Sequence, residues 1–252
     1  MNDGFDTTNE FQSATPPPPP PLGERFVDVF TAPAKAMAAV AVQPAWLVPA
    51  AVLFALMFVY TAANVHVLVP AQLEMALDAG GAGTEAIHAQ MDLFTDPPVW
   101  LRVVSGLGAG FTVVVFSLLV PGLILHLFTR LSSGTADLKH TLGAVFWAGL
   151  IAYGLRTVLG WIILVATGEA RYAGLTAASF LEGVDPQSVL FSVAGLYGDP
   201  FMYWTLWVVA VGLATCHRLP LGRAVTVVAA TYVLGSAFPI GMALISQAFS
   251  NM

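Results

Sequence analysis

The sequence predicts an all-α integral membrane protein: five transmembrane helices preceded by an interfacial amphipathic helix. Two features of composition lead to this fold class, since 57% of the 252 residues are hydrophobic and 10% are Asp, Glu, Lys or Arg. Soluble domains carry about 25% charged residues, because they must cover a large surface. The third feature is the clustering of the apolar residues into five long segments, which indicates membrane spans.

The first element is residues 1–22, a polar segment that ends in six consecutive prolines, Pro16 to Pro21. Such a run adopts an extended polyproline II conformation with no packing partner of its own, so we predict a disordered proline-rich tail. A ligand for SH3-type domains is the alternative, but the run lacks adjacent basic residues. Residues 23–252 are predicted to form one five-span membrane domain.

The second element is the segment Phe26–Val42, whose large apolar residues share one helical face: Phe26, Phe30, Met37 and Val40. Four charged residues are expected off that face: Glu24, Arg25, Asp28 and Lys35. Pro33 interrupts the pattern. We therefore expect one or two short helices that lie in the membrane interface and do not cross it.

The five apolar segments follow, and a helix needs roughly 20 residues to cross about 30 Å of hydrocarbon. The predicted spans are Trp46–Val69, Leu101–Leu127, Leu142–Ala166, Phe201–Cys216 with its flanks, and Ala224–Phe249. Asp199 and Pro200 precede the fourth span, where they suit the N-cap and the first helical turn.

The charges between the spans predict the orientation. Basic residues precede the first span and occupy the second–third and fourth–fifth connections: Arg25, Lys35, Arg130, Lys139, Arg218 and Arg223. The other two connections are mainly acidic. By the positive-inside rule the N-terminus is cytoplasmic and the C-terminus external, and we predict a bacterial inner-membrane protein.

Several function classes receive no support from the sequence. The formal net charge is −6 and the nine Lys and Arg are scattered, so a nucleic-acid partner is not predicted. GxSxG, Walker and GxGxxG motifs are absent, and no two of the five histidines share the spacing of an HExxH pair. We therefore predict no enzyme, no catalytic or metal-binding residues and no cofactor.

Gly106 and Gly110 form a GxxxG motif in the second span. In membranes this spacing allows close contact between helices, so both glycines are predicted to pack against another helix.

Arg156 is the polar residue that the pattern explains least, because it lies about 15 Å from the nearer end of the third span. A buried arginine satisfied by neighbouring helices is the first interpretation, and an anion, lipid-phosphate or partner site is the second. Pro121 and Pro239 leave carbonyls without a donor at Ser117 and Gly235. Counting depth along the spans predicts that Arg156 donates to one of these carbonyls, or to a water held there.

The chain resembles the Yip family of five-span membrane proteins, in particular its bacterial branch. The resemblance rests on Phe30-x-x-Pro33, on PAWLVP before the first span, and on GDPFMYW and VGLATCHRLPLGRA around the fourth. The motif residues are Phe30, Pro33, Pro44, Trp46, Pro49, Asp199, Phe201, Trp204 and Gly212. Eukaryotic members are associated with Rab-type GTPases, partners that are not expected in bacteria, and the resemblance carries over no catalytic residue.

The functional prediction is a non-enzymatic inner-membrane protein that organises the membrane or serves as an accessory subunit of a membrane complex. Its expected partners are the lipid bilayer and other membrane proteins or further copies of itself. The alternative is a small-molecule or ion transporter or channel, in which Arg156 lines a polar path.

Overall fold

The computed structural model describes residues 20–78, 91–181, 184 and 188–250. Nearly all of the predicted tail, residues 1–22, therefore lies outside the described residues. The first helices are α1 (Leu22–Thr31) and α2 (Pro33–Val42), which meet at Ala32. Pro33 occupies the first position of α2 and fixes the break, as the sequence indicated.

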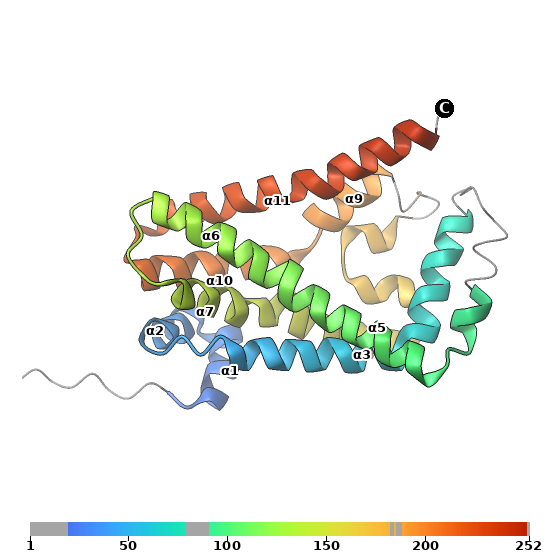
Figure 1. Ribbon diagram of the computed structural model, residues 1–252, viewed down its shortest axis with the longest axis horizontal. Coiled ribbons are helices and arrows are strands. Elements are labelled where there is room, and N and C mark those ends of the chain that lie inside the picture. The colour runs from blue at the N-terminus through green and yellow to red at the C-terminus, as the bar shows by residue number, and fades with distance from the viewer. Residues whose placement is uncertain (1–19, 79–90, 182–183, 185–187, 251–252) are drawn as a thin grey trace, which may run out of the picture.

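Within the described residues, five helical segments run back and forth between the same two ends of the molecule (Figure 1). In chain order they are α3 (Leu47–Asp78); α5 (Val99–Phe111), η1 (Thr112–Leu119) and α6 (Val120–Leu131) as one rod; α7 (Leu138–Gly149), η2 (Leu150–Leu155) and α8 (Arg156–Thr167) as another; α10 (Pro200–His217); and α11 (Leu221–Ser250). We call the end with the α6–α7 and α10–α11 connections the α2 end, and the opposite end the α9 end.

Among the described residues, four helical segments are long and apolar enough to cross a membrane, namely Leu47–Glu74, Val99–Leu131, Leu138–Thr167 and Leu221–Ile245. The chain is an all-α membrane protein. The predicted fourth span is α10, whose 18 residues extend about 27 Å, so it is shorter than its neighbours. Three short helices precede it at the α9 end: η3 (Ala170–Gly174), η4 (Ala177–Phe180) and α9 (Val189–Tyr197).

Prolines and wide turns shape the long spans. Pro49 lies in the first turn of α3, where its missing N–H costs nothing, whereas Pro70 lies inside the helix. The segments η1 and η2 are π-helical, and the Val120 N–H accordingly reaches back five residues to a carbonyl. η1 ends just before Pro121, which cannot donate to the carbonyl four residues earlier.

The core lies where α2, α7 and α10 meet. Every residue from Thr141 to Gly149 in α7 is buried, and the largest side chain among them is Trp147, which is fully enclosed. Phe26 of α1 lies on that indole, with 4.9 Å between ring centroids. The apolar face predicted for Phe26–Val42 therefore packs on protein.

Candidate functional site

Several motif residues that the sequence separates widely lie at contacts between helices. The Phe30 ring lies edge-on to Trp204 of α10, with 6.4 Å between centroids. Trp46, before α3, lies 5.5 Å from the ring of Phe146 in α7. Aromatic pairs at these separations add attraction beyond their buried area. The motifs thus attach the N-terminal helices to the third and fourth spans.

Gly212 makes the closest of these contacts possible. A Cβ atom at this position would lie 2.6 Å from the Cβ of Ala144 and 2.8 Å from the Sδ of Met37. Gly143 is similar, because a Cβ there would lie 2.8 Å from Val40 and 3.3 Å from the Cβ of Pro44. The backbones of α2, α7 and α10 therefore approach to a distance that a side chain would prevent.

Two charged residues of α1 lie inside the fold, which corrects the sequence prediction that they face away from the apolar side. Arg25 is fully buried, and it donates to the Gln43 carbonyl at 2.9 Å and to the Gln43 Oε1 at 2.7 Å. Burial lowers the pKa of the Arg25 guanidinium, which nevertheless stays protonated. The helical pattern missed this because the partner comes from the end of α2.

Asp28 is also buried, with 8% of its surface exposed, and it pairs with Lys35 at 3.0 Å between Nζ and Oδ2. The hydrogen bond to Asp28 raises the pKa of the exposed Lys35 amine. Lys35 also lies 3.9 Å from Glu24 Oε2, so two ion pairs and the Arg25–Gln43 hydrogen bonds join the two short helices.

Asp199 occupies the N-cap of α10, as the sequence predicted. Its Oδ1 accepts hydrogen bonds from the backbone N–H groups of Phe201 at 2.9 Å and Met202 at 3.1 Å. Pro200 fills the first helical position, where its missing N–H costs nothing. Asp199 is only 2% exposed, so its negative charge is held inside the protein by these donors and by the positive end of α10.

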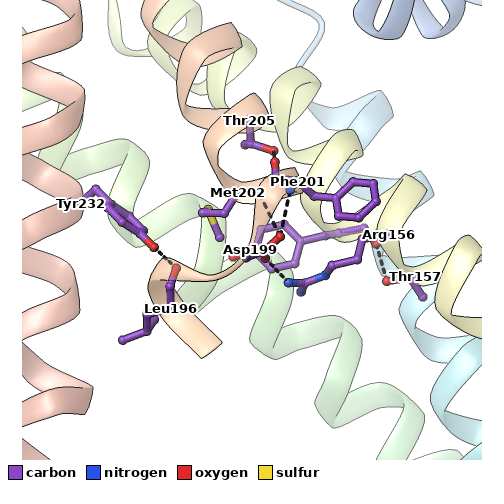
Figure 2. A network of polar contacts seen from close by, with 9 residues as sticks. Arg156, Thr157, Leu196, Asp199, Phe201, Met202, Thr205 and Tyr232 are labelled. Atoms are coloured by element: carbon purple, nitrogen blue, oxygen red, sulfur yellow. Dashed lines mark hydrogen bonds and ion pairs between the residues drawn. The ribbon is translucent and has the colours of Figure 1, made fainter. Parts of the chain in front are cut away.

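The other carboxylate oxygen of Asp199 accepts a hydrogen bond from Arg156, and the two side chains point toward each other (Figure 2). The Tyr153 ring completes the surroundings of the guanidinium, with its centroid 5.9 Å from Cζ. The sequence interpretation of Arg156 as a residue satisfied by carbonyls near the proline kinks was wrong about the partner. A carboxylate is a stronger acceptor for a guanidinium than a neutral carbonyl.

The short length of α10 explains why Asp199 reaches Arg156. Ala144 of α7 and Gly212 of α10 are in contact; Arg156 lies 12 positions beyond the first and Asp199 lies 13 positions before the second. Measured along the helix axes toward the α9 end, both residues therefore lie at nearly the same distance from that contact. The sequence places Asp199 at the entry to the fourth span and Arg156 deep in the third, so it gives no reason to expect that the two charges meet.

Ser117 and Gly235 occupy different places relative to this pair. The Ser117 side chain interacts with the Tyr153 hydroxyl, which places it near the guanidinium. Gly235 is exposed on α11, and a Cβ there would meet nothing within 4 Å. Gly235 thus faces outward and is not part of this polar cluster.

The wide turn of the second span packs against the end of α7, and the wide turn of the third span leads directly into Arg156. A Cβ on Gly149 would lie 2.8 Å from the Cδ2 of Leu118 in η1. At the end of η2, the Arg156 N–H bonds to the Ile151 carbonyl, five residues earlier. π-helical turns often occur at functional sites, and η2 ends directly before Arg156.

A cavity of about 620 Å³ lies on the side of Arg156 that faces away from the core. Its walls come from α3, α8, η3, η4 and α9, and they are mostly apolar. The Arg156 side chain is 25% exposed, whereas that of Asp199 is 3% exposed. The cation therefore meets the cavity and the carboxylate lies behind it.

A second polar cluster, at the α2 end, was not visible in the sequence. The Thr141 hydroxyl lies 2.9 Å from His126 Nδ1 and 2.8 Å from His217 Nε2, so it joins two imidazoles from the second and fourth spans. His217 is almost fully buried. Histidine spacing within one helix cannot reveal this cluster, because its three residues come from three separate helices.

Gly106 and Gly110 lie against α3. A Cβ on Gly106 would be 2.8 Å from the Phe58 carbonyl oxygen, and one on Gly110 would be 2.9 Å from the Phe54 ring. Gly108, between them, faces open space. The two glycines thus mark one side of the second span, as the GxxxG spacing predicts.

The family model described as the Yip1 domain matches residues 27–243. The chain belongs to the Yip1 family. No curated protein and no solved structure matches it. The matched region begins in α1 and ends in α11, so the Yip1 domain includes the N-terminal helices as well as the five helical segments that follow them.

In this Yip1 protein, several motif residues have structural roles. Phe30 and Gly212 attach α1 and α2 to α10, and Asp199 caps α10 and holds Arg156. Among the described residues, no group of three or more His, Cys, Asp or Glu has the arrangement of a metal site.

Proposed function

We propose that this Yip1 protein is a non-enzymatic protein of the bacterial inner membrane that organises the membrane or serves as an accessory subunit of a membrane complex. The observation that carries the proposal is the use of the motif residues: Phe30, Trp204 and Gly212 pack helices together. Residues that serve turnover would instead converge on a reacting group.

Recovery of partners tests this proposal. The protein is cross-linked in intact membranes, extracted in mild detergent and analysed by mass spectrometry beside a Gly212→Leu variant, which disturbs the motif packing. We expect membrane-protein partners, or further copies of the chain, with the wild type and fewer with the variant. Recovery of the chain as a monomer without partners would contradict the proposal.

A transporter or channel is the second candidate, because Arg156 lines a cavity in the spanning region. Its ion pair with Asp199 favours a structural role over a conducting one, since the charge is already balanced within the chain. Flux across proteoliposomes that is lost in Arg156→Gln, but not in Arg102→Gln, would favour transport over the first proposal.

The proposed orientation places the α2 end in the cytoplasm and the C-terminus outside. A reporter fused after Met252 should therefore be external, and a cytoplasmic reporter on an intact chain would contradict the five-span orientation.

Cysteine labelling tests the position of α2. Ala36 is buried, so we place the cysteine at exposed Ala38, in a Cys216→Ala background. Labelling from the external side alone would overturn the assignment of α2 to the cytoplasmic side.

A further inference from the structure

We propose that the cavity beside Arg156 binds an amphiphile with an anionic headgroup, with the headgroup at Arg156 and the apolar chain along α3 and α9. Its volume of about 620 Å³ is within the range of small-molecule sites, roughly 300–1,000 Å³. Neither the packing role of the motifs nor the Arg156–Asp199 pair by itself requires such a space.

The charge of the cavity favours an anion. Arg156 is the one charged residue among the described residues that line it. The carboxylate that balances Arg156 is shielded, because one of its oxygens accepts from two backbone N–H groups of α10 and its side chain is 3% exposed. The guanidinium has five N–H donors, and the bond to Asp199 engages its Nη1. The cavity therefore faces a cation with donors to spare.

Both polar and apolar side chains line the cavity. Tyr60, Gln72 and Thr157 supply polar groups in addition to Arg156. Met57, Leu68 and Phe191 supply apolar surface. A ligand that uses both the cation of Arg156 and the apolar surface has a carboxylate or phosphate at one end and a hydrocarbon chain at the other. The headgroup chemistry is shared by a free fatty acid and an anionic phospholipid.

A displacement experiment tests binding. The purified protein, in phosphatidylcholine nanodiscs, is saturated with the fluorescent acid 11-(dansylamino)undecanoate, and competitors are added. Dodecanoate or phosphatidylglycerol should displace the probe at least about tenfold more effectively than uncharged dodecanol, because only the acids offer Arg156 a negatively charged acceptor. Displacement by dodecanoate alone identifies a free acid, and displacement by phosphatidylglycerol alone identifies a bilayer lipid. Equal displacement by dodecanol, or none by either acid, overturns the proposal.

Two variants locate the site. Arg156→Gln combined with Asp199→Asn keeps a polar side chain at both positions and a good N-cap, but it removes the charges. This double variant should bind the probe about tenfold more weakly, while Arg102→Gln, which removes a basic residue outside the cavity wall, should bind as the wild type. Ala71→Phe fills the cavity without touching the ion pair and should also weaken binding. Unchanged binding in either cavity variant overturns the proposal, and Ala71→Phe decides the matter if the double variant does not fold.

Discussion

The two halves of the third span differ in how fully the protein encloses them. In α7, at the α2 end, nine consecutive residues from Thr141 to Gly149 are buried. In α8, beyond the wide turn η2, only Gly160 and Leu164 are buried, and the cavity opens beside Arg156. One rod thus passes from a closely packed core to an open, partly polar region.

The neighbours of the two halves explain the difference. α7 is covered by α2 and α10, which approach through Gly143 and Gly212. At the α9 end, α9 is apolar along its length and yet has no buried residue. Hydroxyl groups connect it to α11, since Tyr197 lies 2.6 Å from Ser236 Oγ and Tyr232 donates to the Leu196 carbonyl. Close packing at Gly143 and Gly212 thus stabilises the α2 end, while polar contacts connect the helices at the α9 end.

The comparison predicts its largest effect at Gly212. Gly212→Leu would force side-chain atoms into Met37 and Ala144, so we expect a loss of about 3 kcal/mol of stability or failure to fold. The measurement is thermal unfolding in detergent. Gly235→Ala is the matched control, because that glycine meets open space, and alanine favours a helix over glycine by about 0.5–1 kcal/mol. If the two substitutions lowered the melting temperature equally, Gly212 would not lie in a more closely packed environment than Gly235.

The ion pair at the boundary should give the next effect. Asp199→Ala removes the cap of α10 and leaves Arg156 without its carboxylate, which should cost about 3 kcal/mol. Asp199→Asn should cost less, because the amide oxygen still accepts from Phe201 and Met202. Chemical or thermal unfolding of both variants measures the difference. If Asn and Ala destabilise equally, the cap contributes nothing beyond the charge.

A smaller effect is expected where the second span meets α3. Gly110→Leu should cost about 1–2 kcal/mol, because the Phe54 ring must move aside. Gly108→Leu, two positions away, faces open space and should leave stability unchanged or improved. Thermal stability and oligomeric state are measured for both. If Gly108→Leu were destabilised and Gly110→Leu were not, the side of the second span that carries Gly110 would not be the side that faces α3.

The smallest effect concerns Lys35. Its pKa is raised above the ordinary 10.5 by the hydrogen bond to Asp28, so the pair stabilises the fold fully below about pH 10 and less as the pH rises through the raised pKa. The melting temperatures of wild type and Lys35→Gln should therefore converge between about pH 9 and pH 12. A gap that stays constant over this range would show that the stabilisation does not depend on the charge.

The sequence alone determined the membrane class, the helical fold and the approximate spans, because apolar runs of this length have few other solutions. It also located the break at Pro33, the cap at Asp199 and the packing glycines of the second span. Each of these depends on neighbours within one helix or one turn, and such local constraints can be read from spacing.

Tertiary structure alone decided which polar side chains meet. Asp199 pairs with Arg156, Arg25 turns inward to Gln43, and Thr141 joins His126 to His217, although each partner lies on a different helix. Spacing within a helix contains no information about the height at which two helices stand beside each other. That height is set by the contact of Gly212 with Met37 and Ala144 and by the shortness of α10, and both are properties of the packed molecule.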